Sequence, residues 1–383
     1  MGEILKNPVA AEKAAKGKNA RENSGIRAAY QHHIWKKLFF MVFLLLLTLF
    51  LSAFIITIGP LDLSVWEVYH ILYNELLVLL STLLNLIFPN SFEVIETPGN
   101  VVWDIRFPRI VAGLLAGFGL GICGCVMQAV LKNPLASPFT LGISAGASFG
   151  VAVAAVLGVG IIGGPYLLVG NAFLFAMLCS LFIIGLASFK GATSETLILA
   201  GIAVNYLFSS LSSLFQYFAT DEQLRLIVSW GMGDLAAFSW KNFPLLLVIF
   251  LICIPLIYLK ANDLNLMTIG DESAKSLGVN ANEVRIFTML LASLLVATIV
   301  CFTGTIAFIG LVAPHVARML IGADHRFLLP ASGLLGALLL IASDAVALNI
   351  ISPTTIPTGI MCSLLGVPFF IYLIVKGKRK EFW

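Results

Sequence analysis

Long apolar runs separated by short polar segments make up nearly the whole chain. About 20 apolar residues in a helix cross a hydrocarbon core of about 30 Å, and runs of this kind recur from residue 38 to residue 375. In a bilayer the backbone groups must bond within the segment, so these runs are helices. The sequence therefore predicts an all-α, polytopic membrane protein with about ten transmembrane helices. They are expected at residues 38–58, 108–130, 139–158, 166–188, 193–218, 240–258, 284–302, 305–321, 327–348 and 358–375.

Basic residues set the predicted orientation. With ten spans, nearly all of the 23 Lys and Arg residues fall on the side of the amino terminus, and the exceptions are Arg106, Arg109, Arg225 and Lys241. Because basic residues accumulate in cytoplasmic loops, both termini are predicted to be cytoplasmic. Residues 1–37 are expected to form a mobile basic tail, and residues 376–383 a second one. The apolar segment 76–88 is too short for a span and is expected to be an interfacial or packed helix.

Composition excludes several classes of function. Hydrophobic residues make up 59% of the chain and charged residues only 11%, which is typical of an integral membrane protein, and no nucleic-acid partner is expected. The six cysteines lie in apolar runs without a CxxC pair, so they are interpreted as core residues and no metal site is expected. The chain has no GxxxxGK[ST] phosphate loop and no nucleophile–base constellation. We therefore predict a non-enzymatic subunit without a cofactor of its own.

Residues 260–285 form a long polar interruption between two apolar blocks. Asp271 can cap a short helix over 272–277, and Gly278 can end it in the left-handed conformation. Asn280 and Glu283 have the spacing of a capping box that begins the next apolar run. A short capped helix between two membrane segments is suited to transmit force. An ordinary solvated loop with one helical turn explains the same residues.

Two kinds of stripe mark the predicted spans. Glycines at a spacing of four occur in the second span (113, 117, 121) and the third (142, 146, 150), which favours close helix packing. The fifth span carries a polar face that either lines a transport path or packs against another helix. This face consists of Gly201, Asn205, Ser209, Ser212 and Gln216. Asp344, near the end of the ninth span, is interpreted as a structural or interfacial residue.

Several motifs, in a fixed order, resemble one family of membrane proteins. They are RFPR at 106–109, NPLASP at 133–138 followed by LGISAGA, GDESAKSLG at 270–278, GTIAFIGLVAPHVAR at 304–318, and IPTG at 356–359. This series is similar to the FecCD family of ABC-importer permeases, which serve iron-siderophore, haem and vitamin B12 uptake. The resemblance covers about residues 38–375.

The resemblance implies an architecture and partners. It implies a homodimer in the cytoplasmic (inner) membrane, whose subunits each consist of two inverted five-helix halves. Two ABC ATPase subunits bind ATP and Mg on the cytoplasmic side, and one extracytoplasmic substrate-binding protein docks outside. Where the family often has an outer arginine and a glutamate, this chain has Leu348 and Thr355, which puts the docking face of the second half in doubt.

The resemblance also implies roles for particular residues. Arg106 and Arg109 match outer arginines that dock the binding protein, and such residues are expected to be exposed. Thr193 and Ser194 fall at the cytoplasmic gate, at the inner end of the span whose polar face would line the pathway. The helix that couples to the ATPase corresponds to Gly270, Asp271, Glu272, Ser273, Ala274, Lys275, Ser276, Leu277 and Gly278.

The sequence therefore predicts a permease subunit that translocates an iron chelate or related metal cofactor, driven by ATP hydrolysis in another chain. Two alternatives stay open. The same architecture could carry a corrinoid, haem or molybdate. A secondary transporter that works without ATP would share the apolar spans and the polar face.

Overall fold

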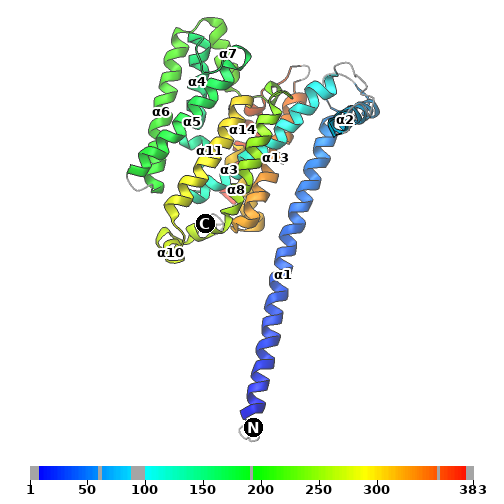
Figure 1. The fold of residues 1–383 in the computed structure, drawn as a ribbon, viewed down its shortest axis with the longest axis vertical. Helices are drawn as coiled ribbons and strands as arrows, with labels where there is room; N and C mark the ends of the chain where they lie inside the picture. The colour runs from blue at the N-terminus through cyan, green and yellow to red at the C-terminus, as the bar shows by residue number, and fades with distance from the viewer. Residues whose placement is uncertain (1–7, 59–62, 88–99, 190–192, 352–353, 377–383) are drawn as a thin grey trace.

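The computed structural model describes residues 8–58, 63–87, 100–189, 193–351 and 354–376, which form helices and their connections (Figure 1). The α-helices are α1 (Pro8–Ile55), α2 (Val65–Ile87), α3 (Phe107–Val130), α4 (Ile143–Leu157), α5 (Leu167–Phe189), α6 (Ser194–Phe218), α7 (Asp221–Gly231), α8 (Phe243–Leu259), α9 (Ala261–Ile269), α10 (Asp271–Ser276), α11 (Ala281–Thr303), α12 (Ile309–Ile321), α13 (His325–Asn349) and α14 (Thr358–Lys376). Short elements are the π-helix η2 (Val102–Arg106) and the 3-10 helices η3 (Pro138–Leu141), η4 (Gly164–Tyr166) and η5 (Leu235–Ala237).

The apolar segments of the sequence are helical in the structure, and some of them are long enough to count as membrane spans by length and composition. Among the described residues, six helical segments are long and apolar enough to cross a membrane. They lie in α1, η2 with α3, η4 with α5, α6, α11 and α13. α8 and α9 qualify together as one span with a bend of 47°. α4, α12 and part of α14 are apolar but shorter. The all-α membrane fold is therefore confirmed, and the count of ten is not.

The amino-terminal tail differs from its prediction. Helix α1 extends back to Pro8, so residues 8–37 are helical where a mobile tail was expected. This segment is rich in Ala, Lys, Arg and Glu, which are strong helix formers, and a helix can continue into it from the apolar part without a new nucleation step. Figure 1 shows α1 running well beyond the bundle. The carboxyl-terminal tail after Lys376 and the first seven residues lie outside the described residues.

The apolar segment at 76–88 belongs to α2, which is longer than the sequence suggested. Ser64 and Glu67 form a reciprocal capping box: Ser64 N donates to Glu67 Oε2 at 2.8 Å, and Glu67 N donates to Ser64 Oγ at 3.2 Å. This start signal places the first turn eleven residues before the apolar run. α2 is not among the six spans, and it lies nearly end-on in Figure 1 while α1 runs along the vertical.

Helix α3 lies at the centre of the bundle, packed most extensively against α13 and also against α12 and α11. Glycines permit this proximity. A Cβ on Gly117 or Gly121 would overlap the α13 backbone, and a Cβ on Gly124 would overlap the carbonyl oxygen of Gly310 in α12. The predicted stripe in α4 acts in the same way, because Gly146 and Gly150 face the backbone of α5. Close packing is therefore confirmed for these glycines.

This contact predicts which glycine tolerates a methyl group. Gly124→Ala should strongly lower the thermal unfolding midpoint, because the added Cβ meets backbone that no rotamer change can move. Gly185→Ala in α5 is the matched control, since nothing lies within 4 Å of its added Cβ. Thermal unfolding in detergent measures both variants. Equal unfolding midpoints for the two variants would show that α3 and α12 can move apart without a loss of stability.

Candidate functional site

The short helix α10 is built by its two glycines. Gly270 is the N-cap residue, with φ 140°, and Gly278 follows the helix with φ 85°. The amide of Gly278 donates to Lys275 O at 3.0 Å and that of Val279 to Ala274 O at 2.9 Å, which is the bond pattern of a Schellman motif. Gly278 is therefore the left-handed stop that the sequence predicted. Asp271 is not the cap, because the helix begins one residue earlier than expected.

The carboxylate of Asp271 instead joins α10 to the rest of the bundle. Lys132, just after α3, places its Nζ 2.8 Å from Asp271 Oδ1, and Arg285 in α11 donates from Nη2 to Oδ2 at 2.9 Å. Arg285 is 1% exposed, and its Nη1 also donates to Asn282 Oδ1 at 3.0 Å. We call Asp271, Lys132 and Arg285 the clasp. It fixes the short helix to two of the long ones.

The carboxylate of the clasp is ionised at neutral pH. Burial would raise the pKa of Asp271, but the hydrogen bonds and charges of Lys132 and Arg285 outweigh it and hold the pKa below its ordinary value. A carboxylate with a lowered pKa stabilises the fold above its ordinary pKa, and this contribution disappears as the pH falls through the folded-state pKa. The contribution of Asp271 to the clasp is therefore lost in acid.

The start of α11 confirms one half of a predicted cap. Asn280 is the N-cap, and its side chain accepts from Asn282 N at 3.2 Å. Glu283 does not return to the backbone of Asn280 as a capping box requires; its Oε1 accepts from the Asn280 side-chain amide at 2.7 Å. The turn between α10 and α11 is thereby fixed.

The residues expected at the gate begin α6, close to the clasp. Thr193 is the N-cap, and its hydroxyl accepts from Thr196 N at 3.3 Å. Ser194 donates from Oγ to the carbonyl oxygen of Val130, the last residue of α3, at 3.2 Å. Arg285 donates from Nε to this same oxygen at 3.3 Å. The clasp and the start of α6 therefore share one acceptor.

A polar groove of about 380 Å³ follows α6. Four of the five residues predicted to line a path lie along it: Asn205, Ser209, Ser212 and Gln216, opposite Ser144, Ser148 and Phe139. Ser212 is 5% exposed, and its hydroxyl has no partner among the described residues. Gly201 is the exception, because it faces the backbone of Thr140 and Leu141 and so contributes to packing.

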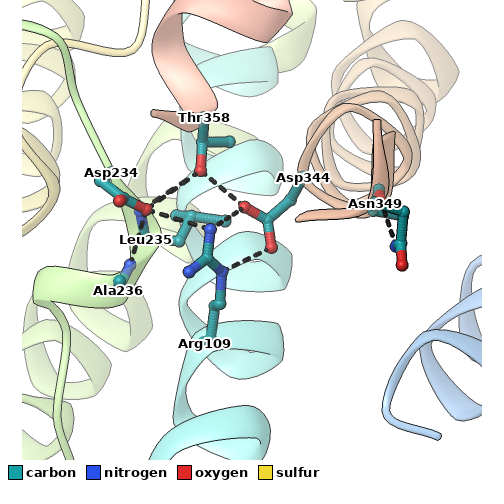
Figure 2. A network of polar contacts seen from close by, with 8 residues as sticks. Arg109, Asp234, Leu235, Ala236, Asp344, Asn349 and Thr358 are labelled. Carbon is teal, nitrogen blue, oxygen red and sulfur yellow. Dashed lines mark hydrogen bonds and ion pairs between the residues drawn. The ribbon is translucent and has the colours of Figure 1, made fainter. Parts of the chain in front are cut away.

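The other end of α3 carries a buried ionic network, shown in Figure 2. Arg109 donates from Nε to Asp344 Oδ2 at 2.8 Å and from Nη2 to Oδ1 at 2.9 Å, and its Nη2 lies 3.1 Å from Asp234 Oδ1. Thr358 donates to Asp344 Oδ1 at 2.6 Å. The network joins α3, α13, α14 and the segment before η5. Asp344 is thus a structural residue, as interpreted from the sequence.

The expected exposure of the two docking arginines is wrong. Arg109 is 7% and Arg106 9% exposed, and Arg106 donates from Nη1 to Ile56 O at 3.2 Å. Carboxylates in distant segments draw Arg109 inward, and no local pattern shows them. Their docking role stays a prediction that would require these contacts to open. Within the described residues, no group of three or more His, Cys, Asp or Glu is placed to hold a metal.

Comparisons with known proteins place these features in a family. The model of the FecCD transport family matches residues 43–376. The hemin transport system permease protein of Yersinia pestis is 37% identical, over 73% of this chain and 85% of that protein. The molybdate import system permease protein of Haemophilus influenzae is 35% identical, over 90% and 96% respectively. A solved structure described as an inward-facing conformation of a metal-chelate type ABC transporter superposes with a TM-score of 0.74 at 32% identity, covering 88% of this chain and 99% of that one.

The buried network predicts a large loss of stability when its cation is removed. Arg109→Met keeps much of the apolar stem but leaves Asp344, 3% exposed, without its counter-ion. The expected loss is about 3 kcal/mol or more in the free energy of unfolding, since breaking a buried pair strands the remaining charge. Denaturant unfolding in mixed micelles measures this loss. Arg225→Met on exposed α7 is the control, and an equal effect at both positions would contradict the network's role.

Proposed function

The chain belongs to the FecCD transport family, and we propose that it carries an iron chelate or a related metal cofactor across the cytoplasmic membrane as the permease of an ABC importer. ATP hydrolysis in partner ATPase subunits drives the transport. The observation that carries this proposal is α10, a short capped helix held by the clasp at one end of the bundle.

The construction of α10 suits a contact with a moving partner. One side chain, Ala274, is fully buried beneath the helix, while Glu272, Ser273, Lys275 and Ser276 are exposed. A groove of about 630 Å³ runs beside it, lined by Asp271, Glu272, Lys275 and residues 278–282. A partner seated here would move α3 and α11 through the clasp. The sequence has no phosphate loop, so the nucleotide and Mg belong to that partner.

The groove along α6 supports a path between two copies of this chain. Large apolar side chains stand exposed on the same helix, including Tyr206 at 74%, Tyr217 at 82% and Leu199 at 68%. We propose that they pack in a homodimer, so that the polar grooves of the two copies face one central path. The unpartnered hydroxyl of Ser212 would then meet water or cargo in the path. A substrate-binding protein outside delivers the cargo.

The cargo is the finer part of the proposal. The relatives above are named for hemin and for molybdate, and the described groove is lined by hydroxyl, amide and apolar groups without a charged side chain. Such a lining has no feature that distinguishes an iron chelate from a corrinoid, haem or an oxyanion. Co-purifying the binding protein and identifying the ligand that it retains tests this part. A retained molybdate or corrinoid would replace the iron chelate and leave the ABC architecture intact.

A secondary transporter is the competing function. It would move cargo in vesicles that contain this chain but no ATPase subunit, driven by an ion gradient alone. We expect no uptake under those conditions, and uptake only when the ATPase subunits and ATP are present.

A proline in α10 should break the coupling. Ala274→Pro removes the amide that donates to Gly270 O at 2.9 Å and places a ring in the buried turn. We expect the ligand-loaded binding protein to stop stimulating ATP hydrolysis, with the dimer still assembled. Val65→Pro is the control, because position 65 is the exposed first residue of α2, where proline is tolerated. Wild-type stimulation in Ala274→Pro would reject the role of α10.

A further inference from the structure

At the carboxyl-terminal end of α3, the carbonyl group of Val130 is hydrogen-bonded by side chains and not by the turn that follows the helix. The last residues of a helix lack amide partners for their carbonyls, and turns or side chains must supply them. Three of these carbonyls are satisfied by the turn that follows: Met127 O by Leu131 N, Gln128 O by Asn133 N, and Ala129 O by Lys132 N. The carbonyl of Val130 is bound by Ser194 Oγ at 3.2 Å and by Arg285 Nε at 3.3 Å.

Arg285 reaches in two directions at once. Its Nε points to the end of α3, while its Nη2 binds Asp271 in α10. The side chain is 1% exposed, so packing leaves it little freedom. Because a guanidinium is planar and its donors are fixed relative to one another, a shift of one contact must tilt the other. The negative end of the α3 dipole also favours a cation at this carbonyl.

On the basis of the proposed function, we propose that Arg285 is a positioning residue that links α10 to the start of α6 through the carbonyl oxygen of Val130. A displacement of α10 moves Asp271, and with it the guanidinium. The distance from Arg285 Nε to Val130 O then changes. Because Ser194 Oγ donates to the same oxygen, the strength of its hydrogen bond changes as well. Movement at the ATPase side thereby reaches the residues predicted to close the path.

Arginine-to-lysine substitution separates this linkage from the charge of the clasp. In Arg285→Lys a single ammonium group can bind either Asp271 or Val130 O. It cannot hold both acceptors in the fixed geometry of a guanidinium group. We expect stimulated ATP hydrolysis to persist while the amount of cargo moved per ATP falls about tenfold, the factor for one lost hydrogen bond to a charged group. Arg326→Lys is the matched control, as Arg326 is exposed and pairs with the nearby Asp324.

Ser194→Ala tests the other side of the carbonyl with a smaller change. It should lower the cargo moved per ATP in the same direction, and combining it with Arg285→Lys should add little, because both act through one oxygen. Strictly multiplicative losses would show independent roles and reject the linkage. Loss of hydrolysis together with transport in Arg285→Lys would also reject it, since that pattern indicates failed contact with the ATPase.

A labelling readout reports the movement itself. The six cysteines are buried, so Ser213→Cys, an exposed position of α6 that lines the polar groove and not the proposed dimer contact, can be modified selectively. In the assembled complex we expect its labelling rate to change on ATP addition, and this change to disappear with Ser194→Ala. If the labelling rate still changes on ATP addition in Ser194→Ala as it does without that substitution, the linkage is overturned. Absence of ATP-dependent transport in the unmodified complex would instead refute the proposed function.

Discussion

The close approach of α3 to its neighbours is the constraint on which the rest of the structure depends. In a bilayer, helices gain nothing from leaving lipid of equal apolarity, so association depends on van der Waals contact and on polar links. α3 uses both kinds of interaction. Glycines bring its middle against α13 and α12, Arg109 joins one end to α13, and Val130 and Lys132 receive α6, α11 and α10 at the other. One helix thus connects both ends of the bundle.

Features that depend on local periodicity were predictable from the sequence. The apolar runs, the glycine spacing and the left-handed position of Gly278 each follow from a few neighbouring residues, and the structure confirms them. The polar face of α6 was predicted in the same way, except for Gly201. Gly201 has the predicted spacing, but it packs against the backbone of the preceding segment. The groove is lined by the other four residues.

Features that depend on distant pairing were not predictable. Arg109 meets Asp344, 235 residues away, and Arg285 meets Val130, 155 residues away. Local sequence gives a charged residue no indication of such partners, so Arg109 was expected at the surface and Asp271 was expected to cap its own helix. The count of ten spans is not confirmed for a related reason. Among the described residues α4, α12 and part of α14 are shorter than the other apolar helices, whereas hydropathy alone extends them into their connections.

The length of α1 has a consequence for the basic residues at its start. At 1.5 Å per residue, a helix of 48 residues is about 72 Å long, more than twice a hydrocarbon core of about 30 Å. The candidate span occupies only Gln31–Ile55, so the helix backbone continues for more than 20 residues before it. Electrostatic attraction fades over about 8 Å at physiological salt. Where the apolar part of α1 crosses a bilayer, the backbone positions of its earliest basic residues therefore lie more than one screening length beyond the headgroups.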